Sequence, residues 1–375
     1  MSEPKRVLFV TAPIGSGHMR AAQAIMKELE RLQPGVQTKM ANIFDFISPM
    51  LGNTIYKGYL KVLKYFPQAY GMAYGWGNTN KLALAGREII SRYMSDHMES
   101  FLMKYSPAAV VCTHATPAGM VAQLAKRGKL TIPSIAAVTD FTVHRLWVYP
   151  ELDYYFVADN AMRDDLAKWG VPYNKSSAVG IPVDPAFLSQ SPKEEILSKL
   201  GLNNHFKTVL IMGGGAGVLP MDKIVKACDQ VDASFQIIVV AGNNQEMFIK
   251  LEKSQMCYRH PIKIVGFVNN VHELMAASDL LISKPGGMTT AEATSQGLPM
   301  LIFRPIPGQE EANTCYLKRK QAAIKVDSPS DVQKTLRRLL VEHPDELTRL
   351  KKNSYTLRQP EAAETIARHI LLQIT

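Results

Sequence analysis

The stretch from Lys284 to Asn313 decides the fold of the second half of the chain, and it reads KPGGMTTAEATSQGLPMLIFRPIPGQEEAN. The short apolar run at 279–283 before it has the length of a buried strand. After the Pro-Gly-Gly turn, residues 288–296 have helical character, and a Gly-Leu-Pro sequence ends them. A second apolar run at 300–303 leads into another loop rich in proline and glycine. The pattern predicts a strand, a glycine turn and a helix, followed by a second strand.

A glycine turn between a strand and a helix is an arrangement that receives phosphate. Glycine lets an anion come close to the backbone, and the unpaired N–H groups at the start of the helix face it. Glu292 lies one turn into the helix, where its carboxylate can accept hydrogen bonds from hydroxyl groups such as those of a ribose. The alternative is an ordinary turn whose glycines only relieve backbone strain. Spacing alone leaves both interpretations open.

The N-terminal half begins with the same kind of pattern. Residues 6–13, RVLFVTAP, are typical of a strand, and from Gly17 apolar residues recur at helical spacing as far as Leu32. Ser16 is the predicted N-cap of this helix. His18 therefore starts a helix at the carboxyl end of a strand, the edge where open α/β sheets bind ligands. The helix N-terminus lowers the pKa of an imidazole and keeps it able to take a proton. A histidine that only caps the turn is the alternative.

A second glycine loop, which includes Gly214, follows the strand predicted at 207–212. Two halves that each begin with a strand, a glycine loop and a helix predict an α/β protein with two facing Rossmann-like domains and an interdomain cleft. The glycines of the second loop either reach a diphosphate or form an ordinary tight turn. The segment 180–185, with a glycine and two prolines, is the predicted linker.

The length and composition of the chain are those of a folded protein with two domains. The chain has 375 residues, of which 46% are hydrophobic and 20% are charged. Its four cysteines show no metal-binding spacing, which suits a reducing cytosol. No apolar run approaches the length that spans a bilayer. The first residues read as a strand rather than as a secretory signal.

The formal net charge of +10 permits nucleic acid, an anionic membrane or a phosphorylated ligand as partner. Nucleic acid is disfavoured because the sequence has no zinc-finger spacing and no aromatic RNA-binding motif. Arg20 stands where a dinucleotide-binding fingerprint has its third glycine, and no P-loop motif occurs. A dinucleotide-binding site and a P-loop nucleotide site are therefore both discounted. No acidic D-x-D cluster and no H-E-x-x-H motif indicates a metal site.

Residues 42–101 contain a pattern that bears on whether the protein contacts a membrane. Lys57, Lys61 and Lys64 are spaced to share one face of a helix, while aromatic and aliphatic residues fall mostly on the other side. Such a helix can lie on an anionic membrane surface with its lysines at the headgroups. An ordinary surface helix is the alternative. The segment from Tyr65 to Trp76, rich in Tyr, Gly and Met, can line a groove that admits lipid.

Four segments resemble the family 28 glycosyltransferases, in particular the diacylglycerol glucosyltransferases and monogalactosyldiacylglycerol synthases. They are GSGHMRAAQAI at 15–25, TDFTVHRLWVYPELDYYFVAD at 139–159, IVGFVNNVHELMAASDLLISKPGG at 264–287, and the KPGG-x-T-x-x-E, GLP and P-x-PGQE-x-x-N pattern of the opening stretch. The resemblance spans most of the chain and implies a fold of the GT-B type.

The resemblance also implies roles for individual residues. His18 is the candidate general base, and Asp140, at another strand end, orients it or the acceptor hydroxyl unless it only caps a loop. The membrane and acceptor region comprises Lys57, Lys61, Lys64, Tyr65 and Trp76. Further residues are implied to bind the uracil, ribose, phosphates and sugar of the donor, and two of them come from the glycine loops. They are Gly17, Gly214, Phe267, Val268, Gly286, Gly287, Met288, Thr289, Glu292, Gln309, Glu310 and Asn313.

The resemblance assigns a task to each part of the chain. We expect an acceptor-binding and membrane-associating domain at 1–182 and a UDP-sugar-binding domain at 183–357. As in related folds, a terminal helix within 358–375 is expected to pack back on the first domain. The enzyme is expected at the inner face of the cell membrane, in contact with its anionic surface.

The implied reaction is the inverting, metal-independent and cofactor-free transfer of a hexose from a UDP-sugar to the hydroxyl of 1,2-diacylglycerol. Glucose is favoured as the sugar, and galactose is possible. The product is a membrane glycolipid. Two alternatives stay open: transfer of N-acetylglucosamine to a lipid-linked cell-wall precursor, and a non-catalytic protein that senses UDP-sugar.

Overall fold

The computed structural model describes residues 4–12, 16–46, 66–189, 191–213 and 219–374, together with residues 52, 54, 58 and 61. Packing divides the chain into two compact units. The N-terminal unit comprises Met1–Pro185, Ile306–Gln309 and Gln359–Thr375, and the C-terminal unit comprises Ala186–Pro305 and Glu310–Arg358. Each unit is built on one parallel sheet with helices around it, which confirms the predicted α/β fold with two Rossmann-like domains.

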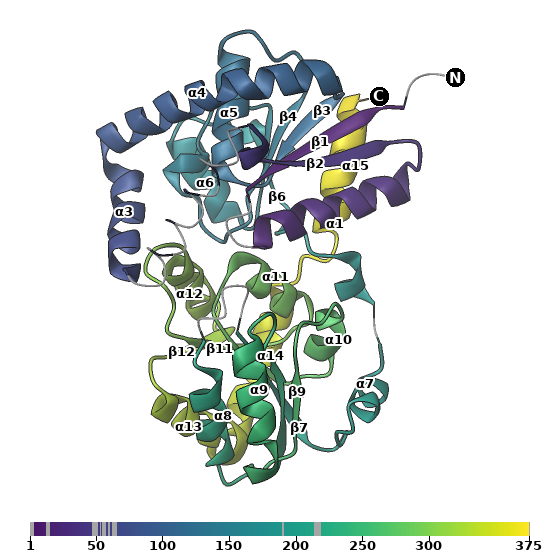
Figure 1. Ribbon diagram of the computed structural model, residues 1–375, viewed down its shortest axis with the longest axis vertical. Coiled ribbons are helices and arrows are strands. Elements are labelled where there is room, and N and C mark those ends of the chain that lie inside the picture. Colours follow the sequence, from purple (N-terminus) through teal and green to yellow (C-terminus); the bar gives the residue numbers. More distant parts are fainter. Residues whose placement is uncertain are drawn as a thin grey trace. The chain divides into compact units, whose positions relative to one another are not determined.

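The sheet of the N-terminal unit has six parallel strands in the order β2-β1-β3-β4-β5-β6 (Figure 1). The strands are β1 (Arg6–Thr11), β2 (Gln37–Asn42), β3 (Ala109–Cys112), β4 (Ser134–Ala137), β5 (Tyr154–Val157) and β6 (Ser176–Ala178). Every residue of β3 and β4 is buried, as parallel strands covered by helices on both faces require.

Helices connect these strands and cover the sheet. They are α1 (Gly17–Leu32), α3 (Pro67–Thr79), α4 (Lys81–Tyr105), α5 (Ala115–Lys126), α6 (Asn160–Lys168) and α15 (Ala362–Ile374), with the short turns η1 (Ile43–Phe46), η2 (Arg145–Trp147) and η3 (Tyr173–Lys175). The helix predicted from Gly17 to Leu32 is confirmed as α1. Ser16 takes the N-cap position, but its side chain makes no capping hydrogen bond, so the predicted cap is corrected.

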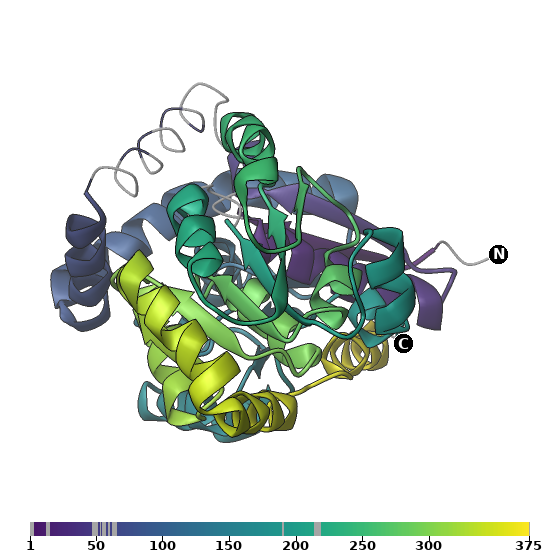
Figure 2. The same cartoon turned by 90° about the horizontal axis from the view of Figure 1, so that it is seen from below.

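The last helix belongs to the N-terminal unit. Figures 1 and 2 show α15, at the yellow end of the colour scale, beside the purple α1, and the two helices make extensive contact. On its inner face Ile366, Ile370 and Ile374 join the hydrophobic core that contains Val7 and Phe9 of β1. The C-terminal end of the chain therefore completes the core that its first strand begins.

The sheet of the C-terminal unit also has six parallel strands, in the order β12-β11-β10-β7-β8-β9. The strands are β7 (Lys207–Met212), β8 (Phe235–Val240), β9 (Ile262–Val265), β10 (Leu280–Ser283), β11 (Met300–Phe303) and β12 (Ala323–Val326). Read from the other edge, this is the strand order of the Rossmann fold. The strands predicted at 207–212 and 300–303 are confirmed.

The helices of the C-terminal unit begin with the one that follows the linker. They are α7 (Lys193–Lys199), α8 (Met221–Asp229), α9 (Gln245–Lys253), α10 (Val271–Ala276), α11 (Gly287–Ser295), α12 (Gln309–Arg319), α13 (Pro329–Arg337) and α14 (Pro344–Thr356), with the short turns η4 (Pro185–Leu188) and η5 (Gln255–Cys257) and the π-helix η6 (Arg338–Glu342). The helix predicted at 288–296 corresponds to α11.

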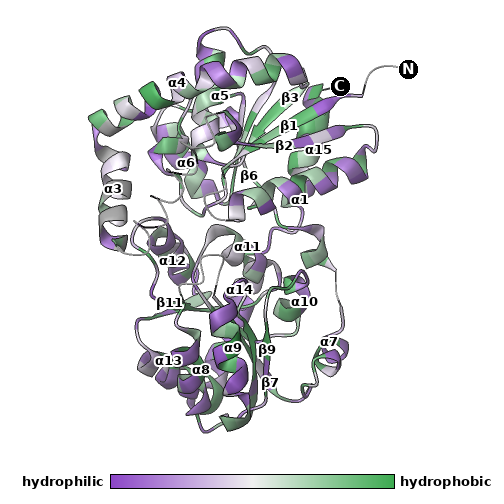
Figure 3. Cartoon of the chain, viewed as in Figure 1, coloured by the Kyte–Doolittle hydropathy of each residue, from purple (hydrophilic) through white to green (hydrophobic). Residues whose placement is uncertain are grey.

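Hydropathy follows this architecture. In Figure 3 the strands β1 and β3 are green, which marks them as hydrophobic, whereas α13 and α8 carry purple, hydrophilic segments. The core of the C-terminal unit is formed by strand residues such as Ile211, Ile237 and Ile282 and by helix residues such as Ile224 and Leu336. Burial of apolar side chains on both faces of each sheet is the main source of stability for such a layered fold.

We predict that Ile370→Ala destabilises the N-terminal unit, because it removes a fully buried side chain from its core. The expected loss in the free energy of unfolding is about 2–5 kcal/mol. The matched control is Leu372→Ala in the same helix, where the side chain is 74% exposed, and its expected effect is below about 0.5 kcal/mol. Urea denaturation followed by circular dichroism measures both. Equal losses in the two variants would contradict the docking of α15.

Candidate active site

His18 lies at the point where the strand order of the first sheet changes direction. β1 pairs with β2 on one side and with β3 on the other, so the chain leaves β1 and β3 toward helices at the same edge. Gly17 is the first residue of the helix α1 that follows β1, and His18 is the second. In open α/β sheets this switch point at the carboxyl ends of the strands is where ligands bind.

Two oxygen atoms hold the Nδ1 atom of His18. The backbone carbonyl of Thr113 lies 2.9 Å from it, and the side-chain hydroxyl of Thr139 lies 2.7 Å from it. A carbonyl oxygen only accepts, so Nδ1 carries the ring proton and donates it. The lone pair of the neutral ring is then on Nε2, the atom that can take a proton from a substrate hydroxyl.

The surroundings keep His18 neutral. Burial lowers the pKa of His18 below its usual value, and this effect prevails over the negative charge of Asp140 and the hydrogen bond to Thr113, which both raise it. A neutral imidazole near pH 7 is the form that acts as a general base. From the sequence this lowered pKa is expected from the helix N-terminus, whereas in the structure burial is its largest cause.

A second histidine packs against the first. The rings of His18 and His114 are 4.7 Å apart between centroids and stand at 88° to each other. His114 Nδ1 accepts a hydrogen bond of 3.1 Å from the backbone N–H of Thr116 and so caps α5. Burial, and to a smaller degree the neighbouring His18, hold the pKa of His114 well below its usual value. Both imidazoles are therefore neutral, with their protons on opposite nitrogens.

Asp140 follows β4 and is buried near the same strand ends. It acts on His18 through its charge, while Thr113 and Thr139 fix the ring orientation at Nδ1. Residues 306–309 are grouped with the N-terminal unit, and there Gln309 donates a hydrogen bond to a carboxylate oxygen of Asp140. The predicted role of Asp140 in catalysis stays a prediction.

Two further hydroxyl groups belong to this strand-end cluster. Thr11 ends β1, and Thr113 directly follows β3. Both side chains are buried, and in the part of the chain that the structure describes neither hydroxyl has a hydrogen-bond partner. Thr113, His114 and Thr139 were not predicted as site residues from the sequence, although each is a polar residue at or just after the end of an apolar strand.

The glycine turn of the C-terminal unit lies at the switch point of its own sheet, where β10 pairs with β7. Residues 285–286 connect β10 to α11, and α11 begins with Gly287, Met288 and Thr289. The N–H groups of a first helical turn have no partner inside the helix and can receive an anion. In the same turn the hydroxyl of Thr290 is buried, with no hydrogen-bond partner among the residues described.

Two predicted donor residues are buried beside this turn. Glu292 lies in α11 and Asn313 in α12, and both side chains are almost fully enclosed. The side-chain amide of Asn313 donates a hydrogen bond of 3.0 Å to the backbone carbonyl of Pro285. Asn313 therefore ties α12 to the glycine turn. Its contact with a sugar and that of Glu292 with a ribose stay predictions.

The remaining predicted residues divide into those that the structure describes and those that lie outside the described residues. Phe267 and Val268 lie in the loop between β9 and α10, with the Phe267 side chain exposed, and Glu310 is the second residue of α12. Lys61 and Trp76 are exposed. Outside the described residues lie Lys57, Lys64, Tyr65 and Gly214.

Among the described residues the structure shows neither a metal-binding cluster nor a helix suited to span a membrane. No three His, Cys, Asp or Glu side chains gather there in a way that would hold a metal ion. None of the helices described combines the length and the apolar character needed to cross a membrane.

Solved structures share this architecture of two Rossmann-like units, which is that of the GT-B glycosyltransferases. MurG from Acinetobacter baumannii superposes with a TM-score of 0.64 at 16% sequence identity, covering 98% of this chain and 100% of that chain. HepE from Anabaena, in complex with UDP, superposes with a TM-score of 0.57 at 13% identity, covering 98% of each chain. At such low identities the likeness concerns the fold.

Family models match both halves of the chain. Residues 18–183 match monogalactosyldiacylglycerol (MGDG) synthase, and residues 208–366 match the glycosyltransferase family 28 C-terminal domain. The chain belongs to the family 28 glycosyltransferases and is a sugar-transferring enzyme.

Relatives align over nearly the whole chain. The processive diacylglycerol beta-glucosyltransferase of Bacillus subtilis is 29% identical over 382 residues, with 99% of this chain and 96% of that protein covered. The protein of the same name from Bacillus pumilus is 28% identical over 373 residues, with 100% and 96% covered.

We predict that Asp140→Asn moves the acid limb of the pH profile of kcat/KM to lower pH. The carboxylate raises the pKa of His18, so its loss lowers that pKa and the base stays neutral in more acidic solution. The plateau rate falls by on the order of tenfold, because a less basic imidazole is a weaker general base. The control is Asp165→Asn on α6, an exposed carboxylate of the same unit, for which no change is expected. A limb that moves to higher pH would contradict the assignment.

Proposed function

We propose that the enzyme transfers a hexose, glucose in preference to galactose, from a UDP-sugar to the hydroxyl of 1,2-diacylglycerol, with inversion at the anomeric carbon. The observation that carries this proposal is the alignment of the whole chain with proteins named diacylglycerol beta-glucosyltransferase. The match of residues 18–183 to the MGDG synthase model supports the same lipid acceptor.

The chemistry of the N-terminal unit suits deprotonation of an alcohol. In the proposed reaction Nε2 of His18 takes the proton of the acceptor hydroxyl as its oxygen attacks the anomeric carbon. The bond between that carbon and the phosphate oxygen breaks, and UDP leaves with the bonding electrons. Attack from the face opposite to the leaving group turns an α-linked donor into a β-glycoside. Asp140 stabilises the imidazolium that forms.

The C-terminal unit suits the donor. The diphosphate is proposed to bind at the start of α11, where the N–H groups of the glycine turn and the helix dipole offset its charge as UDP departs. This preorganised arrangement requires no metal ion in the proposed mechanism. Glu292 is proposed to hold the ribose, and Gln309 and Glu310 the hydroxyl groups of the sugar.

The test of this function is an assay with purified protein and liposomes that contain diacylglycerol. UDP-glucose, UDP-galactose and UDP-N-acetylglucosamine are supplied separately, and the lipids are then separated. We predict a hexosyl-diacylglycerol product from the wild-type protein. His18→Ala should lower kcat by on the order of 100-fold or more and leave the Kd of UDP nearly unchanged, because it removes the general base and no donor contact.

His205→Ala, at an exposed histidine of the C-terminal unit, serves as the control and should keep wild-type activity. A product formed only from UDP-N-acetylglucosamine, or no lipid product at all, would reject the proposed function. A large loss of UDP affinity in His18→Ala would reassign the residue to the donor site.

We also propose that α3 and α4 of the N-terminal unit contact an anionic membrane at the inner face of the cell membrane. Leu82, Ile89 and Tyr93 of α4 are exposed large apolar side chains, and their spacing of seven and four residues puts them on one helical face. Figure 3 shows green, hydrophobic segments along α4. The exposed Trp76 of α3 and Arg92 of α4 supply an interfacial ring and a positive charge.

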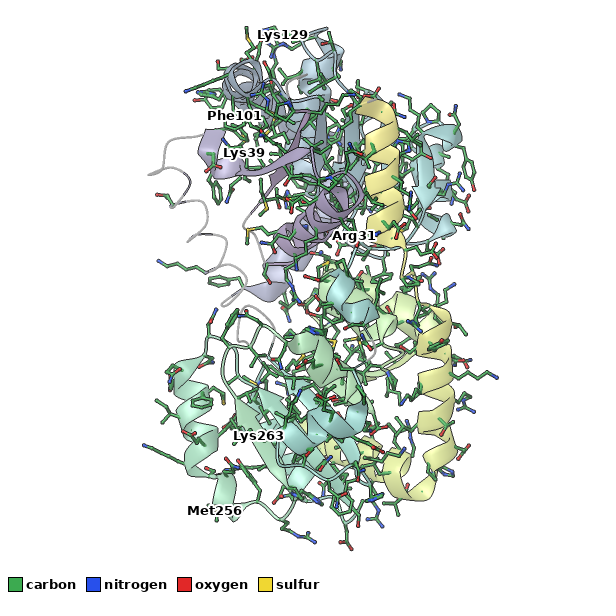
Figure 4. All side chains as sticks on the ribbon, turned by 90° about the vertical axis from the view of Figure 1, so that its right-hand side faces the viewer. Arg31, Lys39, Phe101, Lys129, Met256 and Lys263 are labelled. Carbon is green, nitrogen blue, oxygen red and sulfur yellow. The ribbon has the colours of Figure 1, made fainter. Side chains whose placement is uncertain are left out.

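We predict that Ile89→Glu weakens binding to vesicles of phosphatidylglycerol about tenfold or more, because it puts a carboxylate where a 70% exposed apolar side chain meets the lipid. Activity on diacylglycerol dispersed in detergent should stay at the wild-type level. The control, Met256→Glu, changes a side chain that is 94% exposed in the C-terminal unit (Figure 4) and should bind vesicles as the wild type does. Equal vesicle binding by all three proteins in sedimentation would reject this surface.

A further inference from the structure

Lys284 is a charged residue at the donor site to which the sequence argument gave no role. It directly follows β10 and precedes the turn that opens α11, so it lies at the switch point of the second sheet. A lysine in this place is costly to bury unless its ammonium group is paired. The partners of this ammonium group therefore indicate what it does.

The ammonium group connects two segments of the C-terminal unit. Its Nζ atom donates a hydrogen bond to the backbone carbonyl of Arg304, just after β11, and lies 3.7 Å from a carboxylate oxygen of Glu310 in the first turn of α12. The side chains of Lys284 and Glu310 are 16% and 19% exposed, so the pair is shielded from water on most sides. Burial lowers the pKa of Lys284, and the charge of Glu310 opposes that effect.

The backbone at Arg304 needs such support. Its φ angle is +42°, in the left-handed region that non-glycine residues seldom adopt. The residue starts the loop that leads to Gln309 and Glu310. Because Lys284 binds both the beginning of this loop and the residue at its end, it fixes the distance that the loop spans.

A second link strengthens the same connection. Asn313, three residues beyond Glu310 in α12, donates to the backbone carbonyl of Pro285, the residue after Lys284. The N-terminal part of α12 is thus attached, through Glu310 and Asn313, to the two adjacent residues Lys284 and Pro285 that precede α11. Glu310 is the member of this cluster whose carboxylate is partly accessible, and an ionised carboxylate accepts hydrogen bonds from hydroxyl groups with well-defined directions.

We propose that Lys284 is a positioning residue for the donor sugar: its ammonium group pairs with the Glu310 carboxylate and holds it in place so that it accepts hydrogen bonds from the sugar hydroxyls. This inference rests on the proposed function. Lys284 acts through Glu310, and the nucleotide part of the donor is recognised elsewhere. The consequence is selective: loss of the ammonium group weakens recognition of the sugar and leaves recognition of UDP intact.

Lys284→Gln tests this inference, because glutamine can still donate to the carbonyl of Arg304 but carries no charge. We expect kcat/KM for UDP-glucose to fall about 10–100-fold, the range for the loss of a hydrogen bond to a charged group. The Kd of UDP, measured by calorimetry on the full chain, should stay within about twofold of the wild type. Lys284→Arg should recover most of the activity, since it restores the positive charge.

A double-mutant cycle adds a readout that a purely structural role would not move. Glu310→Gln should show a similar loss for UDP-glucose, and the double variant should be no worse than either single variant, because both changes disrupt one unit. The control is Lys325→Gln on β12, which removes an ion pair of 3.6 Å with Asp327, the residue after that strand, and should leave both constants unchanged. Independent, additive losses would overturn the inference.

The outcomes separate this inference from the proposed function. A Lys284→Gln protein with wild-type kcat/KM, or one that loses UDP affinity as much as UDP-glucose affinity, would overturn the positioning role alone. A wild-type protein that neither binds UDP nor consumes UDP-hexose would overturn both. Thermal unfolding of each variant checks folding, and if Lys284→Gln does not fold, Lys284→Arg and Glu310→Gln carry the comparison.

Discussion

The parallel alignment of strands inside each sheet is the constraint on which the candidate sites depend. In the first sheet β1 and β3 pair in register from Val7 with Ala109 to Val10 with Cys112, so the residues that follow them emerge at one edge. β4 continues the same alignment beside β3. Thr113, Thr139 and the helix that carries His18 are thereby brought together, although long segments of chain separate them. The same rule places Lys284 beside the strand β7 in the second sheet.

Apolar strands that end in polar residues produce a site with a low dielectric. The strands bury Val, Leu, Ile and Ala along their length, and the first polar groups beyond them remain shielded from water. In such a place the hydrogen bond that Nδ1 of His18 donates to the carbonyl of Thr113 decides which nitrogen carries the proton. Burial also lowers the pKa of both His18 and His114, so a neutral pair of imidazoles follows from the packing itself.

The two units use the same fold for different chemistry. The N-terminal unit presents a neutral base held by a carbonyl and a hydroxyl oxygen, which suits the deprotonation of an alcohol. The C-terminal unit presents a helix start with a glycine turn, flanked by the ion pair of Lys284 and Glu310, which suits an anionic nucleotide that carries a hydroxylated sugar. A glycosyltransferase needs both functions, and the two family models match the two halves of this one chain.

The sequence by itself determined the strands, the helices that follow the glycine loops, and the position of His18 at a helix start, because hydropathy period and glycine placement are local properties. The resemblance of its motifs pointed to the family. The tertiary structure decided what holds His18, since Thr113 and Thr139 reach Nδ1 only when β3 and β4 lie beside β1. It also decided the partners of Lys284 and of Asn313. These contacts join residues whose separation along the chain has no period, so only the register of the sheets and the packing of the helices brings them within hydrogen-bonding distance.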